Sequence, residues 1–165
     1  MKLINQEKFS SRKNKYLFGS TAAIITNLGL VVGMFSSLNA KVNIIGSILI
    51  IAVADNISDT LGIHIYQEAE GLSDKEVWLS SFTNFISRFI VSLMFILLIL
   101  ALPLKTAVVC CLILGLFIIS FNSYFIAVHK GKNPYLAVLE HIGVAVMVII
   151  LSKALANFVI SQFQY

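Results

Sequence analysis

Five apolar runs, each close in length to a membrane-spanning helix, constrain this chain more than any other feature. They lie at about 16–38, 44–66, 81–102, 105–128 and 134–160. A helix needs about 20 apolar residues to cross roughly 30 Å of hydrocarbon. Only 12% of the residues are charged, roughly half the fraction usual in a soluble domain. We therefore expect an all-α integral membrane protein with a single five-helix transmembrane domain over 16–165.

Positive charge gathers before the first run, in a basic arm over residues 1–15. Its basic residues are Lys2, Lys8, Arg12, Lys13 and Lys15. The arm is long and no small-residue cleavage pattern follows the first run, which favours a retained helix over a removed signal. Lys130 and Lys132 lie between the fourth and fifth runs. Because cytoplasmic loops carry the excess of Lys and Arg, we expect a cytoplasmic N-terminus and a C-terminus on the opposite side. The plasma membrane is the favoured location. This distribution argues for a lipid bilayer and against nucleic acid as the partner.

The second run carries polar groups where hydrocarbon is expected. Asp55 and Asp59 are the costliest of them, since a carboxylate near the bilayer centre costs a few kcal/mol and usually marks an ion or proton pathway. At 100° per residue one helix face combines Asp55, Ser58, Asp59, Gly62 and Tyr66. His64 points to the opposite side, where we expect it to pack near the cytoplasmic interface. The helix continues beyond the membrane into the cytoplasm.

The third run brings a cation into the membrane. Ser81, Asn84 and Arg88 recur at i, i+3 and i+7, which predicts a polar stripe on one helix face. Counting 1.5 Å per residue from the span centres places Arg88 and Asp59 at similar depth, so we predict that they pair or share a water network. The alternative is that Arg88 snorkels, so that its long side chain carries the guanidinium to the membrane interface.

The fifth run adds Glu140 and His141 in its second turn. Glu140 would lie roughly 10 Å to the cytoplasmic side of the centre, within reach of the depth of Asp59. We expect it to join the charge network of Arg88. His141 is either its proton partner or a residue facing the lipid headgroups.

Oxygen ligands in low-dielectric surroundings suit a hard or borderline divalent cation that competes with protons for the same carboxylates. We expect Asp55 and Asp59 to be the central ligands. The expected auxiliary residues are Asn27 and Asn56, as oxygen ligands, and Glu68 and Glu70, which would collect ions at the cytoplasmic mouth. The implied activity is transport of a divalent metal cation in exchange for protons, with the ion as substrate and no permanently bound cofactor.

Enzymatic activity is not expected. The chain has no serine in a glycine-rich elbow, no His-Glu-x-x-His spacing and no Walker loop. Its two aspartates share one helix, whereas an intramembrane aspartyl protease uses two facing helices. Cys110 and Cys111 are adjacent and would point about 100° apart, which favours packing over a disulfide.

The layout resembles the vacuolar iron transporter family. The resemblance rests on the small-residue first run (Gly19, Gly29 and Gly33), on Ser58-Asp59-Thr60-Leu61-Gly62, and on the basic turn from His129 to Pro134. It implies five spanning helices and a homodimer with the pore formed by the first two helices of each protomer. It also implies export of ferrous iron or manganese from the cytosol in exchange for protons. Here the family's long cytoplasmic metal-binding domain is reduced to about 67–80. Asp59 replaces a methionine of the family, which favours a harder ion.

A second interpretation belongs to a different class. A non-transporting membrane scaffold or accessory subunit could keep the same fold, with its buried Asp, Arg and Glu residues serving helix–helix specificity alone. A scaffold should tolerate Asp59→Asn, because an amide still forms hydrogen bonds, whereas a transporter should not.

Overall fold

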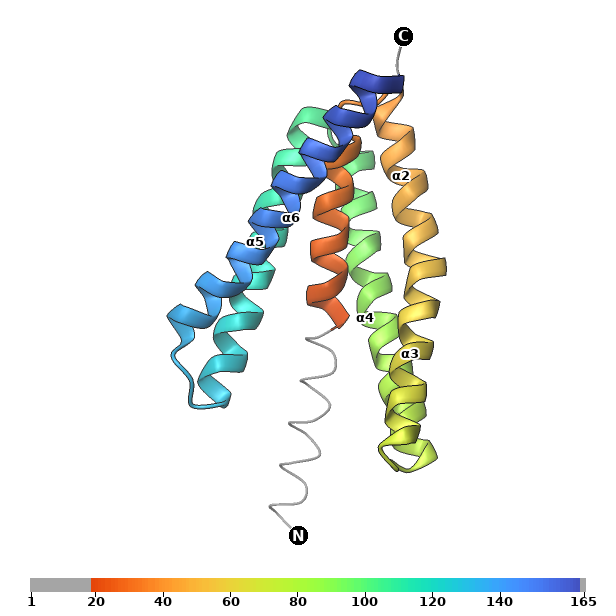
Figure 1. The fold of residues 1–165 in the computed structure, drawn as a ribbon, viewed down its shortest axis with the longest axis vertical. Coiled ribbons are helices and arrows are strands. Elements are labelled where there is room, and N and C mark those ends of the chain that lie inside the picture. The colour runs from red at the N-terminus through yellow and green to blue at the C-terminus, as the bar shows by residue number, and fades with distance from the viewer. Residues whose placement is uncertain (1–18, 164–165) are drawn as a thin grey trace.

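The computed structural model describes residues 19–163, and helices make up nearly all of this range. The elements are a first helix over Gly19–Met34, α2 (Ala40–Ile50), the π-helical segment η1 (Ile51–Asp55), α3 (Asn56–Ala69), α4 (Asp74–Ala101), α5 (Leu104–His129) and α6 (Pro134–Phe163). The predicted basic arm over 1–15 lies outside the described residues. Figure 1 shows the helices running roughly along one common axis.

Four helices are long and apolar enough to cross a membrane, which is the architecture of an all-α membrane protein. They are Ala40–Ala69, formed by α2, η1 and α3 without interruption, and the helices α4, α5 and α6. The part of the first helix that the structure describes is shorter. The long helices extend past the predicted apolar runs because helical hydrogen bonding continues into polar residues. Thus α4 begins at Asp74 instead of 81.

The turns at the predicted cytoplasmic end have the chemistry that the sequence indicates. Gly71 has a φ of 73°, and the Ser73 hydroxyl donates to Glu76 Oε2 over 2.8 Å. At the second turn Gly131 has a φ of 64°, and Asn133 Oδ1 accepts the backbone N–H of Tyr135 over 3.0 Å. Positive φ favours glycine, and capping side chains stabilise helix starts. Ser73 precedes α4 as its N-cap residue without a side-chain bond to the backbone, whereas the Asn133 side chain caps the start of α6.

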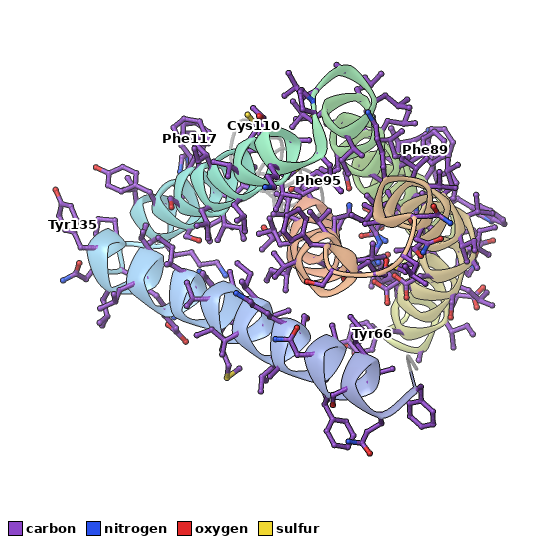
Figure 2. The ribbon with its side chains drawn as sticks, turned by 90° about the horizontal axis from the view of Figure 1, so that it is seen from above. Tyr66, Phe89, Phe95, Cys110, Phe117 and Tyr135 are labelled. Atoms are coloured by element: carbon purple, nitrogen blue, oxygen red, sulfur yellow. The ribbon has the colours of Figure 1, made fainter. Side chains whose placement is uncertain are left out.

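The first helix is the centre of the packing. Figure 2 shows it enclosed between α4, α5, α6 and the α2–α3 helix, with Phe95 of α4 pointing toward it. Ile24, Leu28 and Val31 on this helix are fully buried, as is Phe95. All four belong to one apolar core cluster. Close contact with neighbouring helices, which its small residues predict, is confirmed.

Glycines allow the close approach of the helices around this centre. A methyl group added at Gly115 of α5 would lie 2.9 Å from both Cδ atoms of Leu28 and 3.1 Å from Ile24 Cγ2. At Gly29 it would lie 2.8 Å from Ser152 Oγ of α6. Membrane helices associate mainly through such van der Waals contact, because lipid tails are as apolar as leucine.

The helices α3 and α6 leave much of their surface uncovered. Among the labelled helices of the described range, α3 packs only on α4 and η1, and α6 packs only on α5. Figure 1 shows the beginning of α6 beside the end of α5 and well apart from α3. Among the labelled helices of residues 19–163, none covers the exposed face of α3.

Replacing Gly115 by valine tests the close approach of α5 to the first helix. Gly115→Val should lower the free energy of unfolding by about 1–3 kcal/mol, because the added atoms overlap Leu28 and Ile24. Gly143→Val is the matched control, since nothing lies within 4 Å of a methyl group added at Gly143 in α6. Unfolding in detergent micelles measures both. Equal stability of the two variants would contradict this packing.

Candidate ion-binding site

Arg88 lies near the middle of α4 and is 4% exposed. Its guanidinium donates from Nη1 to Asp59 Oδ2 and from Nη2 to Asp55 Oδ2, each over 2.6 Å. These short distances are typical of charge-assisted hydrogen bonds. The predicted pairing of Arg88 with Asp59 is confirmed, and Asp55 joins it. We call these three residues the ionic triad.

The two carboxylates differ from the arginine in exposure. The side chains of Asp55 and Asp59 are 49% and 46% exposed, whereas that of Arg88 is 5% exposed. Both aspartates therefore reach the guanidinium from the edge of α3, and each keeps its Oδ1 outside the pair. Ser58, Gly62 and Tyr66 are exposed on the same face of α3. The predicted polar face exists, and it is the uncovered face of α3.

The local backbone at the ionic triad is a π-helix. Segment η1 ends at Asp55, and the N–H of Asn56 bonds the carbonyl of Ile51, five residues back. The side chain of Asn56 donates to the carbonyl of Ala52, which its own N–H would bond in a regular α-helix, over 3.3 Å. It also donates to Phe85 O of α4 over 2.9 Å. Single π turns occur often at functional sites. Asn56 thus ties this turn to the helix that carries Arg88.

The expected auxiliary amide ligands do not lie with the carboxylates. Asn56 is 1% exposed and turned toward α4, away from the open face of Asp55 and Asp59. Asn27 is fully buried, and its Nδ2 donates to Ser92 over 3.1 Å. In each case the amide serves contacts between helices. The structure places neither amide on the open face with the aspartates, because depth along a helix does not fix the direction of a side chain, and a ligand role for them stays a prediction.

Glu140 and His141 do not join Arg88. Both are exposed near the beginning of α6, a helix that packs on α5 instead of α3 and α4. Neither has a hydrogen-bond or ion-pair partner within residues 19–163. The beginning of α6, which carries Glu140, lies beside α5 on another side of the molecule from α3 (Figure 1).

The C-terminal end of α3 carries the remaining predicted residues. His64 Nε2 lies 3.5 Å from Glu68 Oε1, and the His64 ring meets Trp78 edge-on at 4.8 Å. His64 therefore packs against α4, as the helical angles predict. Glu70 is exposed at the C-terminal cap of α3. Within the described range no three His, Cys, Asp or Glu residues converge as a ready metal site.

A row of polar contacts joins α3 to α4 and continues the stripe of Ser81, Asn84 and Arg88. Gln67 donates to Ser80 over 2.8 Å, His64 Nδ1 lies 3.2 Å from Ser81 Oγ, and Asn84 donates to Thr60 over 3.3 Å. We call this row, with Arg88 and the Asn27–Ser92 contact, the polar seam. Sequence reasoning found three of its α4 members but missed Ser80 and Ser92. The signal was present, because serines recur on α4 at helical spacing.

Comparison of the chain with protein-family models, with curated proteins and with solved structures finds no match in any of the three. The geometry of the site itself must therefore carry the functional argument.

Neutralising Arg88 tests the ionic triad. Arg88→Gln leaves two carboxylates at membrane depth without their cation, so the free energy of unfolding should fall by about 2–3 kcal/mol. Adding Asp55→Asn and Asp59→Asn to that variant should restore much of the loss, because no unpaired charge remains. Lys153→Gln, at an exposed position of α6, is the control and should change stability by under about 0.5 kcal/mol. Unfolding in detergent is the measurement. A loss that the added asparagines do not reduce would refute the pairing.

Proposed function

We propose that this protein is a membrane transporter of a divalent metal cation of the iron or manganese type, working in exchange for protons. The observation that carries the proposal is the ionic triad. Two half-exposed carboxylates share one buried guanidinium in the middle of long apolar helices. Intramembrane ionisable groups in such positions are typical of ion and proton pathways.

The chemistry of the triad suits a cation that enters from the open face of α3. Two carboxylates and one guanidinium carry a net charge of −1 when all are ionised. Each aspartate bonds Arg88 through Oδ2, which leaves its Oδ1 for another ligand. Carboxylate oxygens are preferred by hard cations, and manganese and ferrous iron also accept them. Asp55 and Asp59 would then be the ligands or proton carriers, and Arg88 would occupy them when no metal is bound.

The uncovered face of α3 supports a homodimer as the working form. In a bilayer this face would present Asp55, Ser58 and Asp59 to hydrocarbon, which is costly. A second copy of the chain that packs its own α3 there would enclose four carboxylates between two buried arginines. The resemblance to the vacuolar iron transporters implies the same assembly, with the pore at the two-fold axis.

The proposed topology has five spans, with the first helix completing the set, and a cytoplasmic N-terminus. The C-terminus then lies on the opposite side, in accordance with the basic residues Lys130 and Lys132 between α5 and α6. Figure 1 shows α6 ending beside the start of α2, at the end of the molecule opposite the turn between α3 and α4. Glu68 and Glu70 would collect ions at the cytoplasmic mouth, and the plasma membrane is the proposed location.

Transport in proteoliposomes tests this function. The wild-type protein should show proton flux that depends on iron(II), manganese(II), cobalt(II) or zinc(II), and Asp59→Asn should reduce it to the level of protein-free vesicles. The reason is that an amide cannot supply the negative charge that a cation requires. Asp74→Asn, an exposed change in the first turn of α4, is the matched control and should transport as the wild type does.

Two outcomes separate the possibilities. Flux in the wild type and in Asp74→Asn, with none in Asp59→Asn, supports transport through the triad. No flux with any ion, from protein shown to be folded, would overturn the proposal.

Cysteine cross-linking tests the dimer separately. In a variant with Cys110→Ala and Cys111→Ala, Gly62→Cys should cross-link two chains, because Gly62 lies on the open α3 face with nothing within 4 Å of an added methyl group. Leu97→Cys is the control, since Leu97 is an exposed residue of α4 and should not cross-link. Equal yields at the two positions would contradict an α3–α3 interface.

A specific observation favours the second candidate, a non-transporting scaffold or accessory subunit. Arg88 already pairs with both aspartates, and no group of three or more ligand residues converges in residues 19–163. An ionic network paired in this way can serve helix register alone. In that case Asp59→Asn would change stability but no ion flux would exist to be lost.

A further inference from the structure

The polar seam contains more buried polar atoms than the protein itself pairs. Five buried side-chain atoms in the described residues have no hydrogen-bond partner, and they are Asn27 Oδ1, Asn56 Oδ1, Gln67 Oε1, Asn84 Oδ1 and Arg88 Nε. All five belong to residues of the seam or of the helix turn beside it. Buried polar atoms are nearly always paired, with protein or with water, so their concentration along one line needs a physical cause.

The residues that carry these atoms are deeply buried. Asn27, Asn56, Asn84 and Arg88 are between 0% and 4% exposed. The three asparagines already use their amide N–H groups on a neighbouring helix, and Arg88 uses its two Nη atoms, so the unpaired atom is the remaining part of an otherwise fixed side chain. Asn84 donates to Thr60, for example, while its Oδ1 accepts nothing. Rotating such an amide would break one contact to make another.

The residues that carry the unpaired atoms either belong to α4 or contact it. Ser80, Asn84, Arg88 and Ser92 recur every four residues, so they lie on one face of the helix. From Ser80 to Ser92 the seam covers about 18 Å at 1.5 Å per residue, more than half the thickness of the hydrocarbon core. It begins at the Gln67–Ser80 contact near the cytoplasmic end of α3 and ends at the Asn27–Ser92 contact.

We propose that the polar seam is a binding site for a file of water molecules inside the protomer, which reaches Arg88 from the cytoplasmic end. The file would be held by Asn84 Oδ1, Asn56 Oδ1 and Arg88 Nε, three atoms aimed between the helices. A buried water typically makes about three hydrogen bonds to polar groups that otherwise lack partners. The site is separate from the open face of α3, where the aspartates are exposed.

Through the seam, Arg88 would contact water between the helices, while a cation would bind the aspartates on the open face of α3. The use of this water by the exchanged protons rests on the proposed function. The hydration itself does not, because it follows from the burial and pairing of the side chains. The experiment therefore measures hydration alone, without any transport.

Radiolytic labelling in isotopically labelled water tests the file in the intact protein. Ser92→Cys places a thiol at the deep end of the seam, and the native Cys111 is a matched reference because it is equally buried among apolar residues of α5. In a Cys110→Ala background, the thiol at position 92 should take up label about tenfold faster than Cys111, since polar cavities hold water and apolar ones stay dry. Peptide mass spectrometry reads both sites.

A second variant tests the route. Asn84→Leu replaces the amide by an apolar side chain of similar size, so labelling at position 92 should fall to the rate of Cys111. Ser87→Cys, on the fully buried Ser87 one turn closer to the cytoplasm, repeats the measurement if Ser92→Cys does not fold.

Each result decides the matter. Equal rates at position 92 and Cys111 would overturn the water file. Fast labelling that Asn84→Leu leaves unchanged would overturn the cytoplasmic route. Labelling of the seam in a protein that shows no flux would uphold the hydration while the transport proposal fails.

Discussion

The constraint on which the rest of this structure depends is a guanidinium in the middle of an apolar helix. Arg88 cannot remain unpaired at that depth, so α3 must present carboxylates to it at the right height. Asp55 and Asp59, one helical turn apart, do so together, and the bidentate arrangement fixes both the rotation and the height of α3 against α4. The remaining contacts between these two helices follow the register that this arrangement sets.

Polar and apolar contacts between helices have different roles in the molecule. Between α3 and α4 amides and hydroxyls form a row of contacts that demand specific partners. Around the first helix aliphatic side chains pack closely against glycine, as at Gly115 and Leu28, and a few polar pairs such as Asn27 with Ser92 are added. Polar pairs determine which helix faces contact each other. Close van der Waals contact supplies the attraction between helices, because lipid provides no hydrophobic driving force.

Sequence reasoning recovered the features that depend on one helix at a time. The depth of Arg88 relative to Asp59 and the starts at Ser73 and Asn133 follow from constant rise and local capping chemistry. Features that depend on which helices are neighbours could not be read in this way. Glu140 has a suitable depth but stands on a helix beside α5, and Asn27 meets Ser92 because the first helix lies against α4. The π turn was missed because a uniform 100° per residue was assumed.

The π turn at Ile51–Asp55 also makes the helix from Ala40 to Ala69 tolerant of a change in length. A π turn holds one residue more than the α turn it replaces, so a helix that lost one residue there could close into regular α geometry with both ends still in place. A residue inserted or deleted elsewhere in this helix would rotate the part before the change by about 100° about the helix axis, relative to the part after it. At η1 the backbone already contains the surplus residue, which makes this segment the position where such a protein could lose one amino acid without losing the alignment of Asp55 and Asp59.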